Sequence, residues 1–210
     1  MYNVPYFKES DRDEIMAFLR GHPFAQITGI AEDGRLIATH VPVLFDERNG
    51  DLVLTAHIMR NSDHWKGFCA NGDVLAVFNG PNCPVKASWY NGMESGGTWN
   101  YMAVHARGTA RMLDQDALVS VLRRLTLQVE GSTDTGANFD DLSDAYVAKM
   151  LPAIQAFEIT VTELDAIFKL SQNKTPDVYD NVVLKLSERG GDSAVIAAEM
   201  TRRRDRVFTS

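Results

Sequence analysis

The sequence predicts a mainly β fold, a small antiparallel barrel flanked by helices. Short runs of alternating or continuous apolar residues, each long enough for one strand, recur from residue 24 onward. Asp33-Gly34 and Asn49-Gly50 are typical of tight hairpin turns. One capped helix, residues 62–70, is inserted between two of the strand-like runs. Hairpin-linked short strands with a single inserted helix favour a barrel over a parallel, doubly wound sheet.

The N-terminal half contains most of the expected strands. Ser10 followed by Asp13 or Glu14 predicts the start of a helix over 11–20, which Gly21 ends. Ser62 or Asn61 caps the inserted helix. Strands are expected at residues 24–30, 35–45, 52–57, 73–79 and 101–113.

The C-terminal half is expected to be mostly helical. Asp114 caps a helix that runs to about residue 129, and Thr175-Pro176 is typical of a helix start. Gly190-Gly191 separates the last two helices. The expected elements are helices at 141–150, 177–189 and 192–204 and a strand at 156–164. We therefore expect a barrel domain over residues 1–165 and a helical extension over 166–210 that packs on it.

Composition excludes some classes of function. The net charge of −7 argues against broad electrostatic binding of nucleic acid. The basic run Arg202-Arg203-Arg204 with Arg206 is interpreted as cations at a helix C-terminus followed by a solvated tail. No signal peptide or membrane span is evident, and the two cysteines lack metal-binding spacing. We expect a cytoplasmic protein with free thiols.

The segment from His57 to Lys66 is the most informative one for function. Arg60 stands directly before a capped helix N-terminus, where backbone N–H groups and the helix dipole favour anions. A guanidinium beside such a terminus can bind a phosphate in a bidentate manner. The segment therefore predicts a phosphate site.

Three further groups can be interpreted in two ways. Thr39 and His40 precede Pro42, which belongs at a sheet edge, so this strand can contact a planar heterocycle or be an ordinary edge strand. The aromatic pair 88–90 and 98–101 can surround a ring ligand or lie in a core or dimer interface. The polar cluster 169–174 can form part of an anion site or a solvated turn.

The sequence shows no catalytic nucleophile, no paired metal motif and no dinucleotide fingerprint. His40 and His57 leave a flavin-free haem site open as an alternative.

Seven motifs resemble one family, in one order along the chain. The motifs are Pro23-Phe24-Ala25, Ala38-Thr39-His40-Val41-Pro42, His57-Ile58-Met59-Arg60-Asn61 followed by Trp65, Val77-Phe78-Asn79-Gly80-Pro81, Ser88-Trp89-Tyr90, Thr98-Trp99-Asn100-Tyr101 and Lys169-Leu170-Ser171-Gln172-Asn173. With these motifs the chain is similar to the PaiB-type proteins, described as FMN-binding negative transcriptional regulators, from Met1-Tyr2 to about Gly190.

This resemblance implies an α+β, mainly β, FMN-binding split barrel of the pyridoxine-phosphate oxidase type. It also implies a homodimer with FMN at the subunit interface. The strand with Thr39, His40 and Val41 would then lie along the flavin ring. The remaining residues implied in the site are Thr55, His57, Arg60 and Asn61 around the phosphate, and Trp99, Asn100, Lys169, Ser171, Gln172 and Asn173, which complete the pocket from the same chain or its partner.

The sequence departs from the family pattern over residues 82–97, where Asn82-Cys83-Pro84 and a glycine-rich loop replace the usual residues. The wall of the site that faces a substrate is therefore expected to differ.

Two functions follow from the resemblance. One is a transcriptional regulator that acts indirectly, because the last helix carries few side chains able to read base edges. The alternative is an oxidoreductase that uses NAD(P)H to reduce FMN and passes electrons to a small acceptor.

Overall fold

A computed structural model describes Met1 and residues 4–92 and 94–208. The residue contacts divide the chain into two compact units. The helical unit comprises residues 1–19, 79–104 and 165–210, and the sheet unit comprises residues 20–78 and 105–164. Tyr2, where the family resemblance begins, and Met93, in the divergent loop, lie outside the described residues.

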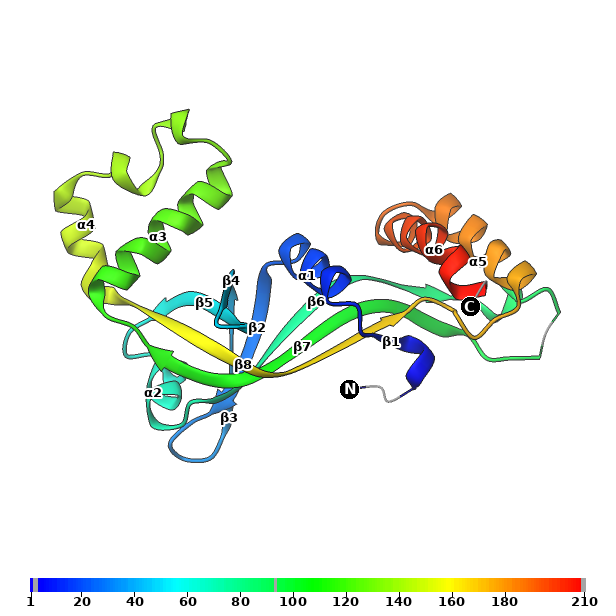
Figure 1. Ribbon diagram of the computed structural model, residues 1–210, viewed down its shortest axis with the longest axis horizontal. Coiled ribbons are helices and arrows are strands. Elements are labelled where there is room, and N and C mark those ends of the chain that lie inside the picture. Colours follow the sequence, from blue (N-terminus) through cyan, green and yellow to red (C-terminus); the bar gives the residue numbers. More distant parts are fainter. Residues whose placement is uncertain (2–3, 93, 209–210) are drawn as a thin grey trace. The chain divides into compact units, whose positions relative to one another are not determined.

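The fold is mainly β with flanking helices, as the sequence predicts (Figure 1). The hydrogen-bonded strand order is β3-β2-β6-β7-β8-β5-β4, with β1 paired to β8. The strands are β1 (Lys8–Glu9), β2 (Phe24–Ile30), β3 (Leu36–Pro42), β4 (Leu44–Arg48), β5 (Asp51–Met59), β6 (Asp73–Val85), β7 (Thr98–Met112) and β8 (Ile154–Lys169). The helices are α1 (Arg12–Gly21), α2 (Asp63–Ala70), α3 (Gln115–Glu130), α4 (Asp144–Met150), α5 (Pro176–Arg189) and α6 (Asp192–Phe208).

The single strand predicted over 35–45 is in fact two strands, β3 and β4, and that prediction is wrong at residue 43. Pro42 has no N–H to continue the β2–β3 ladder. The Val43 N–H instead donates to the carbonyl of Pro23 at 2.9 Å. After this turn β4 pairs with β5, from Leu44 opposite Thr55 to Arg48 opposite Asp51.

Helix α2 packs closely on the β2–β3 hairpin of the sheet unit. A Cβ at Gly67 would lie 2.5 Å from the Ile37 side chain and 2.9 Å from the Ile30 carbonyl oxygen. Only glycine lets the helix backbone approach this closely. Phe68, which is 2% exposed, anchors the same helix to the interior of the sheet unit.

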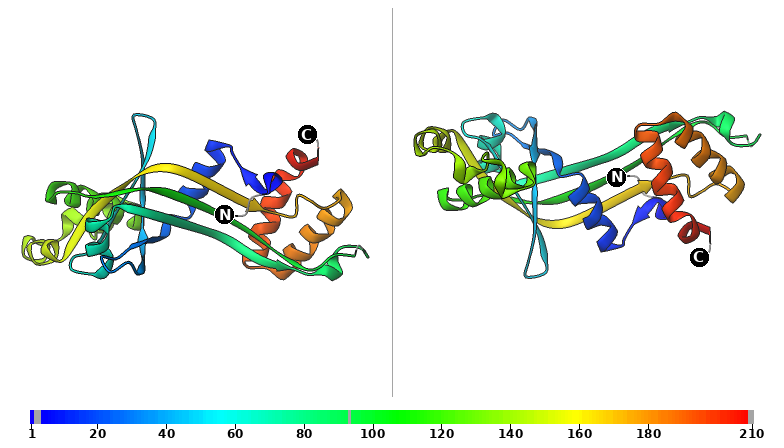
Figure 2. Two further views of the ribbon diagram at one scale, coloured as in Figure 1. Left: turned by 90° about the horizontal axis from the view of Figure 1, so that it is seen from below. Right: turned by 90° about the horizontal axis from the view of Figure 1, so that it is seen from above.

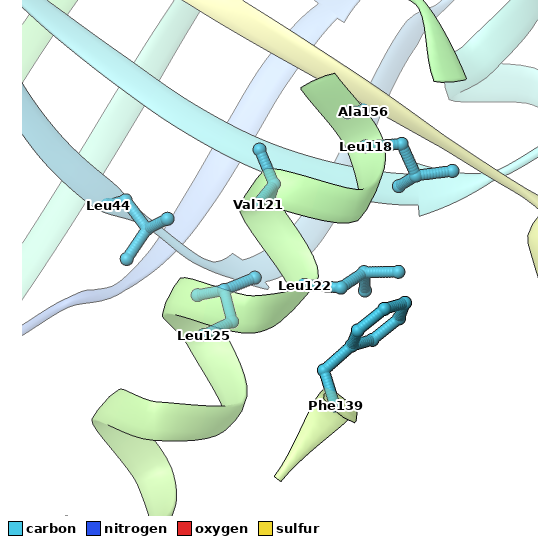
Figure 3. Close-up of a cluster of buried hydrophobic side chains, with 7 residues drawn as sticks. All are labelled: Leu44, Leu118, Val121, Leu122, Leu125, Phe139 and Ala156. Carbon is cyan, nitrogen blue, oxygen red and sulfur yellow. The ribbon is translucent and has the colours of Figure 1, made fainter. Parts of the chain in front are cut away.

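Helix α3 covers a second apolar cluster of the sheet unit. Its buried side chains share one face, as expected for residues three and four apart. Figure 3 shows Leu122 and Phe139 on the same side of this helix. The cluster consists of Leu44, Leu118, Val121, Leu122, Leu125, Phe139 and Ala156. Each large side chain buried here contributes about 1.5–3 kcal/mol of transfer free energy.

In the helical unit, α5 and α6 lie side by side (Figures 1 and 2). Gly190 and Gly191 both have positive φ, 77° and 56°, which glycine adopts without strain, and they form the predicted break between the two helices. The Tyr179 hydroxyl, buried on α5, donates to the Met200 carbonyl on α6 at 2.8 Å.

The arginine run at 202–206 is not a solvated tail, and that interpretation is wrong. Arg203 is only 7% exposed and donates to three carboxylates, those of Glu9, Glu14 and Glu199. Its guanidinium also lies 4.8 Å from the Phe168 ring centroid. The cluster therefore joins the N-terminal segment of the helical unit to α6 through buried, paired charges.

Neighbouring arginines complete this charge cluster. Arg206 donates to Glu9 at 2.9 Å, and Arg202 contacts Glu14 and Glu199. Burial raises the pKa of Glu9, but hydrogen bonds from Arg203, from the Asp11 backbone and from Arg206 outweigh it and hold that pKa below its ordinary value. The pKa of Glu14 is lowered chiefly by its hydrogen bond with Arg202.

Removing the central arginine should destabilise the protein strongly. Arg203→Ala leaves the buried Glu9 without its main partner, and breaking a buried pair costs about 3–5 kcal/mol. Urea unfolding measures the loss. Arg204→Ala is the matched control, because Arg204 forms an exposed pair with Asp180, worth about 0–1 kcal/mol. Equal losses in the two variants would contradict the structural role of Arg203.

The same carboxylates should make stability sensitive to acid. Their folded-state pKa values are depressed below the ordinary glutamate value of 4.5, so the unfolded chain binds more protons in acid. The contribution of Glu9 and Glu14 to the free energy of unfolding is fully present above pH 4.5. It is lost as the pH falls from 4.5 through their folded-state pKa values. Urea midpoints measured from neutral to acid pH test this, and Glu9→Gln should flatten the decline. A decline that is unchanged in Glu9→Gln would exclude Glu9 as a cause.

Candidate functional site

The turn from β5 into α2 has the capped geometry that the sequence predicts. The Ser62 side chain accepts a hydrogen bond from the Trp65 N–H at 3.3 Å and donates to the Met59 carbonyl at 2.7 Å. Asn61 takes a left-handed conformation with φ of 63°, which asparagine tolerates better than most residues. These bonds fix the direction in which the helix N-terminus points.

Arg60 is held in place at this turn. Its backbone N–H donates to the Ala153 carbonyl at 2.8 Å, and its side-chain Nε donates to the Ile154 carbonyl at 2.9 Å. Its two terminal nitrogens form no hydrogen bond or ion pair with the described residues. The half-buried guanidinium is therefore positioned by one nitrogen and leaves two available for an anion.

On β5 and α2, three buried polar atoms have no hydrogen-bond partner among the described residues. They are Thr55 Oγ1 and His57 Nδ1 on β5 and Trp65 Nε1 on α2. Thr55 and His57 are two residues apart on the strand and so point to the same face. An unsatisfied buried donor or acceptor costs about 1–3 kcal/mol, so these two neighbouring elements form a candidate ligand site.

The protonation of His57 is set by its surroundings. Burial lowers the pKa of the imidazole, so the neutral form is favoured near neutral pH. On β8 the residue opposite Thr55 is Glu158, whose carboxylate accepts from Arg48 at 2.8 Å and from Arg111 at 2.7 Å. The negative charge of Glu158 is thus neutralised beside the unsatisfied Thr55 hydroxyl.

The predicted edge strand is confirmed. β3 stands at one end of the strand order and pairs with β2, with Thr39 opposite Ile27 and Val41 opposite Ala25. Thr39 is half-buried and Val41 is buried. His40 is exposed, and its ring stacks on Phe24 with 6.1 Å between the ring centroids.

The other predicted site residues belong to the helical unit, and several are already bonded internally. Asn100, fully buried, accepts from Ser171 Oγ at 3.1 Å and donates to the Met200 sulfur at 3.5 Å. Gln172 uses both ends of its amide on the backbone of its own turn, at Leu170 and Phe168. These side chains fix the turn after β8.

A cavity of about 200 Å³ lies in the helical unit and is lined by four of the predicted residues, Asn100, Lys169, Ser171 and Asn173. Trp99 and Gln172 are not among its lining residues. Trp99 is 49% exposed, and its indole N–H donates to Asn82 Oδ1 at 3.1 Å. Asn82 belongs to the segment that diverges from the family pattern.

Sequence reasoning missed three residues that the structure singles out. Trp65, Tyr90 and Lys174 each occur in or beside a motif noted in the sequence, yet none was predicted to belong to the site. Tyr90 and Lys174 line the cavity of the helical unit, and the buried Tyr90 hydroxyl has no partner among the described residues. The signal available was only residue type, which cannot distinguish a bonded side chain from an unsatisfied one.

The described residues contain no group of three or more His, Cys, Asp or Glu arranged to hold a metal ion. Within the same residues no helix is both long enough and apolar enough to cross a membrane.

Residues 1–163 match the family described as "Putative FMN-binding domain". The chain is also 34% identical over 200 residues to the protease synthase and sporulation protein PAI 2 of Bacillus subtilis. This alignment covers 95% of this chain and 96% of that protein. The chain belongs to the PaiB-type family. The predicted membership, and with it a flavin-binding protein of this type, is confirmed.

Solved structures support the fold of this PaiB-type chain. The FAD and heme binding protein from Mycobacterium smegmatis superposes with a TM-score of 0.59 and 16% identity, over 78% of this chain and 73% of that one. The flavocytochrome Anf3 from Azotobacter vinelandii gives a TM-score of 0.58 and 16% identity, over 80% and 72%. At this identity the likeness shows the fold alone, and it confirms the predicted split barrel.

The unsatisfied Thr55 hydroxyl leads to a prediction with opposite effects on stability and binding. Thr55→Val replaces the hydroxyl with a methyl group of similar size. The ligand-free PaiB-type protein should then gain about 1 kcal/mol of unfolding free energy, because a buried, unpaired polar atom is removed. Flavin should bind several-fold more weakly, since one hydrogen-bond partner is lost. Urea unfolding and flavin titration measure the two effects.

Thr126→Val is the matched control on α3. The Thr126 hydroxyl donates to the Leu122 carbonyl at 2.9 Å and accepts from the Phe139 N–H at 3.2 Å. This variant should lose about 1 kcal/mol of stability and bind flavin normally. If Thr55→Val lost stability to the same extent as the control, its hydroxyl would have a partner within the protein.

Proposed function

We propose that this protein binds FMN, with the phosphate at the β5–α2 turn and the flavin ring along β3. The observation that carries the proposal is the set of unsatisfied buried atoms on Thr55, His57 and Trp65, in a chain that belongs to an FMN-binding family. A threonine hydroxyl, a neutral imidazole and an indole N–H can all donate hydrogen bonds to an anionic nucleotide.

The phosphate requires counter-charge, because the chain as a whole carries a net charge of −7. Arg60 can supply it through the two nitrogens that remain after the bond to Ile154. The first turn of α2 adds backbone N–H groups and the positive end of the helix dipole. Asp63 in that turn lies 3.7 Å from Arg35, which offsets its charge.

The edge position of β3 supports contact with a flat ring. Among the described strands β3 has a ladder partner on one side only, so backbone groups of Thr39 and Val41 on the other side can face a ligand. Bound FMN would supply the capacity to accept and donate electrons, and the protein would determine its orientation and its electrostatic surroundings.

The site is proposed to lie in a homodimer. Large apolar side chains are exposed on the strands of the sheet unit: Phe24 at 62%, Leu36 at 77% and Met59 at 66%. A second copy that covers these side chains would remove their apolar surface from water. Trp99, Asn100 and residues 169–173 are proposed to complete the flavin pocket from the partner.

The proposed biological role is transcriptional regulation that acts indirectly, in a cytoplasmic protein. The arginines near the C-terminus are occupied within the chain: Arg202 and Arg203 by glutamates and Arg204 by Asp180. Arginines engaged in this way are not available to neutralise DNA phosphates, the term on which DNA affinity chiefly depends. A flavin-dependent change in binding to another protein fits these paired arginines better than direct binding to DNA does.

Arg60→Ala should lower FMN affinity about ten-fold or more, the scale of one charge-assisted hydrogen bond. Fluorescence titration of the flavin-free protein with FMN measures it. Arg107→Ala is the matched control, because Arg107 lies in the same unit and is exposed beside Glu163. Identical FMN affinity in the Arg60→Ala variant and the parent would remove Arg60 from the site.

Parallel titrations with FAD and haem, followed by absorbance, test the identity of the cofactor. Preference for haem over both flavins would overturn the proposal. Rapid reduction of the bound flavin by NADH or NADPH in stopped flow, followed by transfer to a small acceptor, would favour an oxidoreductase over a regulator.

A further inference from the structure

Trp99 exposes an aromatic ring whose polar end is already bonded. The side chain, at the start of β7 in the helical unit, is 49% exposed. Its indole N–H donates to Asn82 Oδ1 on the neighbouring strand β6 at 3.1 Å. An indole has no other hydrogen-bonding group, so the exposed remainder of this side chain is apolar ring surface. Such a surface is suited to pack against a flat ring ligand.

Asn82 is held so that its carbonyl oxygen meets the indole. Its Nδ2 donates to the Gly80 carbonyl oxygen, 3.5 Å away on the same strand. The amide oxygen is then left to accept from the Trp99 N–H. Because an indole N–H only donates and a carbonyl oxygen only accepts, the reversed amide would satisfy neither contact.

The backbone on both sides of Asn82 is restricted. Pro81 and Pro84 have fixed φ angles, and each proline also limits the conformation of the residue before it. Gly80 lies directly against the ring of Phe18 on α1, since a Cβ at position 80 would be 2.5 Å from that ring. The acceptor for the indole therefore belongs to a strand segment with little freedom to move.

The bond has a consequence for any ligand that contacts the ring. A half-exposed tryptophan without this acceptor could occupy several rotamers, and a ligand would have to immobilise it at an entropic cost. With the acceptor in place, the side chain is ordered before binding. Asn82 is also the first residue of the segment in which the sequence departs from the family pattern, so the restraint on Trp99 comes from the divergent segment.

We propose that Asn82 is a positioning residue for the flavin site: it holds the Trp99 indole in the orientation in which the exposed ring stacks on the ring of FMN. The inference rests on the proposed function, in which Trp99 completes the flavin pocket from the partner. Asn82 does not contact the cofactor and acts only through the indole. Its effect is to remove the conformational freedom of the stacking side chain before FMN binds.

Asn82→Leu tests the proposal, because it removes the acceptor and keeps a side chain of similar size at a surface position. An indole stacked on the flavin ring quenches the fluorescence of the bound flavin, so the emission of bound FMN reports the stacking. We expect brighter bound FMN and an affinity about two- to ten-fold weaker than in the parent. Asn82→Asp keeps an acceptor oxygen and should restore both properties.

A second measurement, on the flavin-free protein, tests the hydrogen bond itself. The chain has three tryptophans, so NMR shows three indole N–H signals, and Trp99→Phe identifies the one from Trp99. Exchange of this proton with solvent should be several-fold faster in Asn82→Leu than in the parent, and slow again in Asn82→Asp.

Asn181→Leu is the matched control in the same unit. The Asn181 amide on α5 donates to the Trp89 carbonyl at 2.7 Å, so this variant also loses an asparagine hydrogen bond near a tryptophan. It should leave the exchange of the Trp99 indole proton and the emission of bound FMN as they are in the parent.

The outcomes separate this inference from the proposed function. Failure of the parent to bind FMN would overturn both together. Normal FMN binding with equal flavin emission in Asn82→Leu and the parent would overturn this inference alone. Unchanged emission in Trp99→Phe would do the same, because the indole would then not lie against the flavin. Equal exchange of the Trp99 indole proton in Asn82→Leu and the parent would show that the bond does not fix the side chain.

Discussion

The paired hydrogen bonds of Ser62 determine the geometry on which the candidate site depends. One bond holds the carbonyl at the end of β5, and the other holds the N–H of Trp65 in the first turn of α2. Arg60 and Asn61 lie between these two points, so the directions of the guanidinium and of the helix N-terminus are set together. The absence of a side chain at Gly67 then keeps α2 against the β2–β3 hairpin. The proposed phosphate would meet groups already in place at this turn, which would lower the entropy cost of binding.

The elements that could be predicted from sequence are those with a local cause. The cap at Ser62, the hairpin turns at Asp33-Gly34 and Asn49-Gly50, and the double-glycine break before α6 depend on residues close in the chain. The extents of β6 and β8 were underestimated, since nothing local ends a strand where its neighbours continue to pair. The role of Arg203 was not predictable either, because its partner Glu9 is 194 residues away.

The residue types of the candidate site were predictable, but the state of their hydrogen bonds was not. In the sequence, Asn100 and Gln172 cannot be distinguished from amides that bind a ligand. In the structure, their hydrogen bonds fix the turn after β8. Nothing about their residue type distinguishes Thr55 and Tyr90, yet their buried hydroxyls lack partners in the part of the chain that the structure describes. This distinction arises only when distant strands come together, and it separates side chains that maintain the fold from those available to a ligand.

The long sequence separation within the buried charge cluster has a consequence for biosynthesis. The Glu9 carboxylate emerges from the ribosome long before Arg203, which lies 194 residues further along the chain. Before Arg203 is synthesised, burying the Glu9 carboxylate would leave its charge unpaired, which costs several kcal/mol. The helical unit therefore completes its folding only after translation has passed α6, while the sheet unit, whose residues end at 164, can fold earlier.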